Sequence, residues 1–208
     1  MTNPVITEKT YLALGDSYTI GEKVAPADNF PNQVYALLRK NGIPLAPVRI
    51  IAKTGWTTDE LEAGIKEANE QEPLQPPYDF VSLLIGVNDQ YRGRLVSDYE
   101  PAFKKLLDQA IAFAGGIPGN VVVLSIPDWG VTPFAEGRDG KEIAAAIDSY
   151  NEVNKRVAGD SNVFYINITP GTRKAGDDPS LLAPDGLHPS GKAYREWATQ
   201  VAAFFLRK

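Results

Sequence analysis

The stretch TYLALGDSYTIG, from Thr10 to Gly21, places an apolar run directly before a turn of small residues. The run, Tyr11 to Leu14, predicts a buried strand, and Gly15 predicts a tight turn after it. Ser17 then lies at the carboxyl edge of a predicted sheet, where open α/β sheets carry their functional sites. A turn in which Ser17 only caps the next helix explains the same residues, so this stretch alone leaves both interpretations open.

A second stretch, PDGLHPSG, lies near the end of the chain and favours catalysis. It carries His188, the only histidine of the sequence, shortly after Asp185. A serine hydroxyl needs a base that takes its proton during attack, and neutral imidazole suits that task near neutral pH. Asp185 is spaced so that both side chains of one tight turn can point the same way, which would fix the tautomer of the imidazole. We therefore predict that Ser17, His188 and Asp185 act together.

Four blocks of the sequence, taken in order, resemble those of the SGNH hydrolases, also called GDSL esterases and lipases. They are GDSY at Gly15 to Tyr18, TGWTT at Thr54 to Thr58, GVND at Gly86 to Asp89 and DGLHPS at Asp185 to Ser190. Tyr18 stands where the name-giving tetrapeptide has leucine, a change that the family tolerates. The resemblance implies a serine esterase that cleaves carboxylic esters through an acyl-enzyme on its serine, with no cofactor and no metal.

The resemblance also implies how charge on the reacting carbonyl oxygen is stabilised. It assigns three donors to an oxyanion hole: the backbone N–H groups of Ser17 and Gly55 and the side-chain amide of Asn88. These residue types suit the task, because glycine lets the backbone approach a ligand closely and asparagine is a neutral donor. The neighbouring Asp16 and Asp89 are expected to fix their loops by accepting backbone N–H bonds, and not to react.

Strand and helix patterns alternate along the whole chain. Apolar runs predict further strands at Val48 to Ala52, Asp79 to Gly86, Asn120 to Ile126 and Asn162 to Ile166. Amphipathic spacing predicts helices at Asn29 to Lys40, Thr57 to Ala68, Ser97 to Gly115, Lys141 to Ala158 and from Ser190 onward, where Thr57, Ser97 and Ser190 are the predicted caps. This alternation predicts an α/β fold, a three-layer α/β/α sandwich around a central, mostly parallel five-stranded sheet, and the resemblance implies the SGNH/flavodoxin-like arrangement.

The composition limits the classes of function. With 208 residues, of which 43% are hydrophobic, the chain suits one full core, and we expect residues 1–208 to form a single SGNH hydrolase domain. A net charge of -5 without basic runs argues against a nucleic-acid partner. A single histidine excludes a histidine-rich metal site, and no apolar stretch reaches the roughly 20 residues that span a bilayer. Residues 1–10 lack the pattern of a secretory signal, which predicts a cytoplasmic protein.

The sequence predicts the substrate only as a class of small-molecule esters. Tyr18, Tyr91, Trp129 and Phe134 indicate an aromatic-lined site for a short acyl group or a sugar ester, although the loop with Trp129 and Phe134 could instead just cover the sheet. Lysophospholipase and thioesterase activities occur among relatives, so these substrates stay open, as does an acyltransferase that passes the acyl group to an acceptor alcohol. A non-catalytic binding domain of this fold would be expected to lack the nucleophile, the base or a donor, and none is missing.

Overall fold

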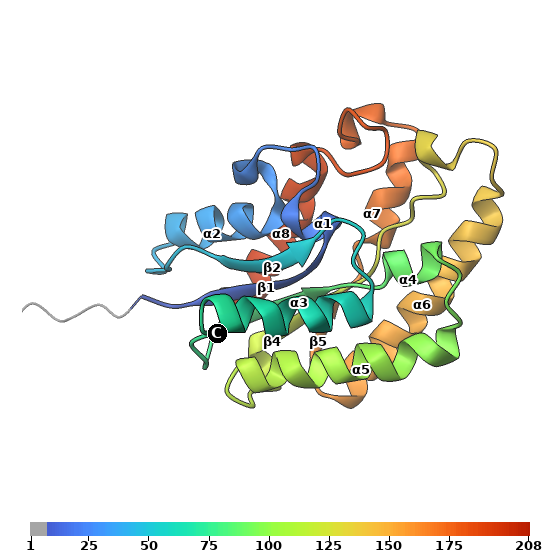
Figure 1. Cartoon of the computed structure of the whole chain (residues 1–208). Coiled ribbons are helices and arrows are strands. Elements are labelled where there is room, and N and C mark those ends of the chain that lie inside the picture. Colours follow the sequence, from blue (N-terminus) through green and yellow to red (C-terminus); the bar gives the residue numbers. More distant parts are fainter. Residues whose placement is uncertain (1–7) are drawn as a thin grey trace, which may run out of the picture.

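A five-stranded parallel sheet forms the centre of the structure, a computed structural model that describes residues 8–208 (Figure 1). The strands are β1 (Tyr11–Asp16), β2 (Arg49–Lys53), β3 (Phe80–Leu84), β4 (Val121–Leu124) and β5 (Phe164–Ile166), in the spatial order β2-β1-β3-β4-β5. Every predicted strand is confirmed, and β1 continues to Asp16, past its predicted end.

The prediction of a cytoplasmic protein was drawn from the opening residues of the sequence. Of these, residues 1–7 lie outside the part of the chain that the structure describes.

Helices cover both faces of this sheet, which confirms the three-layer α/β/α sandwich (Figure 1). On one face α2 (Phe30–Lys40) packs against α8 (Gly191–Phe205), and on the other lie α3 (Thr58–Gln71), α5 (Val96–Phe113) and α6 (Gly140–Asp160). The remaining elements are the short helices α1 (Ser17–Ile20), α4 (Val87–Tyr91) and α7 (Thr169–Arg173) and the 3-10 turns η1 (Pro26–Asp28), η2 (Pro118–Asn120), η3 (Pro133–Ala135), η4 (Lys174–Gly176) and η5 (Pro179–Leu181). Within residues 8–208, no helix has both the length and the apolar character to cross a membrane.

The starts of the long helices follow the predicted caps with one exception. The Glu60 carboxylate accepts a hydrogen bond of 2.9 Å from the Thr57 backbone N–H and completes the capping box of α3. The Ser190 side chain caps α8. The prediction for α5 is wrong, because this helix begins at Val96, before Ser97, and has no side-chain cap. The backbone carbonyl of the preceding residue already accepts bonds from the first turn, so the helix closes one residue earlier than the serine would place it.

The hydrophobic core fills both spaces between the sheet and its helices. One face of α8 is buried and carries Tyr194, Trp197, Ala198, Val201 and Phe205. Every residue of β1, β3 and β4 is buried too, as expected of strands covered on both faces. The direction of strand order reverses between β1 and β3, and in such sheets a crevice opens at the carboxyl ends of those two strands.

Candidate active site

The site at this crevice is built from the residues that directly follow three neighbouring strands. Ser17 follows β1, Gly55 comes two residues after β2, and Asn88 is on α4, shortly after β3. Parallel strands end at the same edge of a sheet, so residues far apart in the sequence meet here. His188 and Asp185 come from a separate turn that precedes α8.

The turn around Ser17 depends on its neighbours. A Cβ atom on Gly15 would lie 2.1 Å from Thr19 Oγ1 and 2.4 Å from the carbonyl oxygen of Leu84, so only glycine fits at this point. Asp16 caps α1, because its Oδ1 accepts a hydrogen bond of 3.0 Å from the Tyr18 backbone N–H. Ser17 is therefore the first residue of the helix. The alternative interpretation of the sequence, in which Ser17 caps this helix, is wrong.

The side chains of Ser17, His188 and Asp185 form one hydrogen-bonded chain. His188 Nε2 lies 3.0 Å from Ser17 Oγ, and His188 Nδ1 lies 2.7 Å from Asp185 Oδ2. Ser17 and His188 are only 4% and 7% exposed, so the pair is largely shielded from water. With Nδ1–H donated to the carboxylate, Nε2 is left free to accept the serine proton. This is the geometry of a nucleophile, a base and an orienting carboxylate.

Asp185 is held in its charged form by its own turn. Partial burial acts to raise its pKa, but the bond from the His188 ring and those from the backbone N–H groups of Leu187 and His188 outweigh this effect, and the pKa lies below its usual value. The turn itself is closed by a 2.7 Å bond from the Ala183 N–H to the His188 carbonyl. Asp185 therefore remains an acceptor for the imidazole at neutral pH.

Gly55 and Asn88 lie in the same cleft as Ser17 and His188. Gly55 has a φ of 84°, in the left-handed region that favours glycine. Asn88 Nδ2 donates to the Trp56 carbonyl at 2.9 Å, and its nearest other partner is Asp16 Oδ2, at 3.4 Å. The Trp56 carbonyl thus anchors the side-chain amide, and the bond to Asp16 is the longer of the two.

Asp89 ties α3, which follows Gly55, to the helix that carries Asn88. Its carboxylate is fully buried and accepts from the Thr58 backbone N–H at 3.0 Å and from the Thr58 hydroxyl at 2.8 Å. Arg94 pairs with the same carboxylate at 2.7 Å. The prediction that Asp16 and Asp89 fix their loops through backbone N–H groups is confirmed for both.

Asp16 is the most strongly perturbed carboxyl group near the site. Complete burial raises its pKa to about 8, repulsion from Asp89 adds to this effect, and the bonds from the Tyr18 N–H and the Asn88 amide oppose it. Because the pKa in the folded protein exceeds the value of about 4 in an unfolded chain, the folded state binds this proton more tightly. The stability that the proton confers is complete below about pH 4 and is lost as the pH rises through about 8.

This linkage gives a measurable prediction. Relative to Asp16→Asn, the wild type is expected to lose about 1.4 kcal/mol in its free energy of unfolding per pH unit between pH 5 and 7, and to level off above pH 8. Denaturant unfolding of both proteins from pH 5 to pH 9 measures the difference. The substitution places a second amide next to Asn88 and so changes the free energy of unfolding by a constant amount. This constant does not affect the slope of that free energy with pH. Parallel pH profiles would mean that Asp16 is already ionised over this range.

The four aromatic residues suggested by the sequence all line the cleft beside Ser17. The cleft has a volume of about 120 Å³, and Tyr18, Tyr91, Trp129 and Phe134 border it together with the residues described above. The loop that carries Trp129 and Phe134 therefore reaches the site and does more than cover the sheet. The Trp129 ring centroid lies 5.3 Å from that of Tyr91 and 5.9 Å from that of Phe134.

Several contacts in the site involve residues that the sequence did not single out. The Arg138 guanidinium lies 5.0 Å from the Tyr91 ring centroid and 5.2 Å from that of Trp129, a distance typical of cation–π contacts. Trp129 Nε1 donates to Gln90 at 2.8 Å. Arg92 donates to the Gly55 carbonyl at 2.6 Å. No pattern in the sequence marks these residues, although Gln90 and Arg92 directly flank the predicted Tyr91.

Within residues 8–208, no group of three or more His, Cys, Asp or Glu side chains is arranged to hold a metal ion. The polar groups of the site are instead a hydroxyl, an imidazole, a carboxylate, an amide and backbone N–H groups. This set can transfer a proton and stabilise an oxyanion. It is the set that acyl transfer needs.

Comparison with solved structures finds the same fold in proteins of low sequence identity. The acetylxylan esterase Axe2 from Geobacillus stearothermophilus is 20% identical, with a TM-score of 0.68 over 95% of this chain and 94% of its own. The esterase EstA from Pseudoalteromonas sp. is 16% identical, with a TM-score of 0.70 over 97% of this chain and all of its own. A lipolytic G-D-S-L protein from Veillonella parvula is 18% identical, with a TM-score of 0.71 over 96% of this chain and all of its own.

A comparison with curated protein sequences gives no match. The family model described as the GDSL-like Lipase/Acylhydrolase family, in contrast, matches residues 13–196 and so spans most of the chain. The matched range includes Ser17, Gly55, Asn88 and His188. The chain belongs to the GDSL-like lipase/acylhydrolase family.

Proposed function

We propose that residues 1–208 form a single catalytic domain that hydrolyses short-chain carboxylic esters with Ser17 as the nucleophile. The observation that carries this proposal is the continuous chain from Ser17 Oγ to His188 Nε2 at 3.0 Å and from His188 Nδ1 to Asp185 Oδ2 at 2.7 Å. A binding domain that had lost catalysis would have no need to keep all three groups in contact. Membership of a hydrolase family points the same way.

In the first half of the reaction, Ser17 Oγ attacks the carbonyl carbon of the ester and its proton passes to His188 Nε2. The tetrahedral intermediate collapses when His188 returns this proton to the oxygen of the leaving alcohol, which leaves an acyl group on Ser17. In the second half, His188 takes a proton from a water molecule, which attacks the acyl carbon. This second tetrahedral intermediate collapses when His188 returns the proton to Ser17 Oγ, which breaks the bond between the acyl carbon and Ser17 and releases the carboxylic acid. Asp185 stabilises the imidazolium that forms in both halves.

Three donors would receive the charge on the carbonyl oxygen: the backbone N–H groups of Ser17 and Gly55 and the side chain of Asn88. Donors fixed by the ends of three adjacent strands need no reorganisation when the charge develops, which is the main source of rate enhancement in such sites. Arg92 and Asp89 support this arrangement, because the first binds the Gly55 carbonyl and the second binds the start of α3.

The shape of the cleft favours small esters. A volume of about 120 Å³ bordered by four aromatic rings leaves little room beside Ser17 for a long chain. Aromatic faces also suit the apolar face of a sugar ring, and the structurally similar Axe2 is an acetylxylan esterase. Acetyl esters, including those of sugars, are therefore the substrates we propose.

Covalent labelling tests this function directly. A fluorophosphonate probe is expected to modify the wild type once, at Ser17, and peptide mass spectrometry identifies the site. Prior incubation with 4-nitrophenyl acetate should slow the labelling, since the ester and the probe compete for one hydroxyl. Labelling at another residue, or none, would contradict the proposal.

A second experiment distinguishes hydrolysis from acyl transfer. It measures the acid and alcohol products with and without an acceptor alcohol.

A further inference from the structure

A second cavity shares part of its wall with the catalytic cleft. Tyr18 and Leu187 line both spaces. The second cavity has a volume of about 20 Å³, enough for about one water molecule. The rest of its apolar lining includes Pro127, Ala175, Leu181, Leu182, Ala193 and Trp197.

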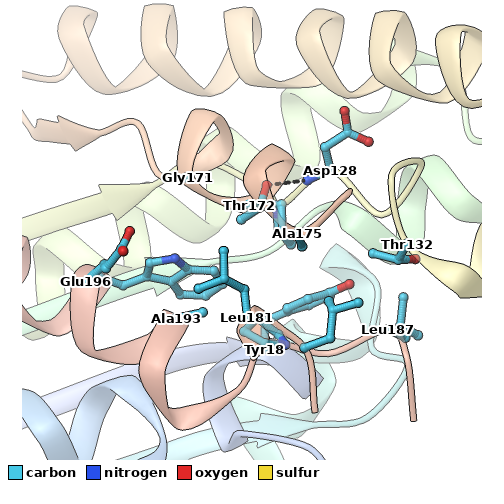
Figure 2. Close-up of a pocket in the computed structure, with 14 residues that line it drawn as sticks. Tyr18, Asp128, Thr132, Gly171, Thr172, Ala175, Leu181, Leu187, Ala193 and Glu196 are labelled. Atoms are coloured by element: carbon cyan, nitrogen blue, oxygen red, sulfur yellow. Dashed lines mark hydrogen bonds between the residues drawn. The ribbon is translucent and has the colours of Figure 1, made fainter. Parts of the chain in front are cut away.

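The chemistry of this cavity suits an alkyl chain and not a polar group. The carboxylates of Asp128 and Glu196, which border it, both point away from its middle (Figure 2). Asp128 is already engaged, with Arg173 Nε at 2.8 Å and the Gly130 N–H at 2.8 Å. Thr132 and Thr172 also line the cavity, and their hydroxyls donate to the backbone carbonyls of Trp129 and Thr169. The rest of the lining is mainly aliphatic and aromatic, and burying a methylene group against such surface is favourable.

The shared wall stands next to the reacting atoms. Tyr18 follows the nucleophile in the chain, is only 4% exposed, and its ring centroid lies 5.0 Å from that of His188. Leu187 directly precedes His188 in the turn that carries the base. A chain that extends from the ester toward these two residues meets their side chains before it can reach the second cavity.

We propose that Tyr18 and Leu187 are the residues that limit the length of the alkyl chain in a substrate, by closing off the second cavity. This inference rests on the proposed esterase function. The chain in question belongs either to the acyl group or to the alcohol, because both extend from the carbon that Ser17 attacks. Removing the wall joins the two spaces, so the cavity and the volume vacated by the wall side chain together take methylene groups that the wild type excludes.

The expected effect is a change in chain-length preference. In Tyr18→Ala, each methylene that enters the cavity raises kcat/KM by about fourfold, as expected for burial of one methylene group. The ratio of kcat/KM for a hexanoyl ester to that for an acetyl ester is measured within each protein, with 4-nitrophenyl esters. In a second series, kcat/KM for butyl acetate and hexyl acetate is compared with that for methyl acetate, and the acid that is released measures turnover. Using a ratio removes any general loss that a loosened His188 causes.

Matched variants separate the wall from other effects. Tyr18→Phe keeps the ring and should keep the wild-type ratio. Leu187→Ala and Tyr18→Leu open the wall with smaller changes, and each should raise the ratio even where Tyr18→Ala fails to fold. Ala175 lines only the second cavity, so Ala175→Leu in the Tyr18→Ala background refills the space and should cancel the gain.

Each possible result of these measurements either supports the proposal or contradicts it. A gain in the acyl series or in the alcohol series, cancelled by Ala175→Leu, supports it and identifies the chain. Three results would overturn it. The first is no gain in either series, and the second is a gain that survives Ala175→Leu. The third is a wild type that already cleaves hexanoyl and hexyl esters as efficiently as acetyl and methyl esters. Loss of 4-nitrophenyl acetate turnover in Ser17→Ala tests the esterase function separately, so failure of one is distinct from failure of the other.

Discussion

Ser17→Ala is expected to reduce kcat for 4-nitrophenyl acetate by about 10⁴- to 10⁶-fold, because it removes the only atom that can form the acyl-enzyme. The residual rate would come from the donors and the cleft, which remain in place. The backbone N–H of residue 17, the Asp16 cap and the strand before it are unaffected by the loss of one oxygen. KM should therefore change far less than kcat.

A control variant distinguishes this effect from a general loss of structure. Ser149 is an exposed serine on α6 whose hydroxyl bonds only to the Ala145 carbonyl, at 3.0 Å. Ser149→Ala should keep wild-type turnover, and all three proteins should unfold at similar temperatures. If Ser17→Ala unfolded normally and still turned over the ester at the wild-type rate, Ser17 would not be the nucleophile.

His188→Ala is expected to cause a loss of similar size, because one imidazole serves as base and acid in both halves of the reaction. The two effects should not add in the double variant, since neither group works without the other. The turn itself should persist, because the Ala183 N–H binds the carbonyl of residue 188 and Asp185 binds its backbone N–H. Turnover of single and double variants with 4-nitrophenyl acetate measures this coupling.

Chemical rescue provides a second measurement of the same role. Added imidazole is expected to restore part of the rate in the His188→Ala variant by entering the space that the side chain vacates. A His188→Ala variant that retains full activity without added imidazole would exclude His188 as the base.

Local sequence patterns were enough to predict most of the fold. Strand β1 could be recognised because its apolar residues are contiguous, and α3 because the capping box of Thr57 and Glu60 acts within one turn. The start of α5 was missed, since the first turn there closes on the carbonyl of Leu95, which no side-chain pattern marks. Patterns of this kind record contacts between near neighbours.

The candidate site also has some residues that local sequence patterns predict and others that they do not. Asp185 and His188 share one turn, so their spacing predicted that they could meet, and their contact with Ser17 followed from the chemistry that serine requires. The bond of Arg92 to Gly55 and the contact of Arg138 with Tyr91 link segments far apart in the sequence. The second cavity arises where Tyr18 meets α8 and the loop before it, and no single segment encodes it.

Ser17 and His188, the proposed nucleophile and base, are 171 residues apart in the sequence. Ser17, Gly55 and Asn88 all belong to the first half of the chain, whereas His188 is put in place by the turn before α8, and α8 packs on α2. Phe205, in the last turn of α8, stacks on Phe80 of β3 with ring centroids 4.4 Å apart. During synthesis, a chain would thus hold its serine and all its oxyanion donors long before it holds a base. In the proposed mechanism, ester cleavage would therefore begin only when the last helix has docked, and activity would report the completion of folding.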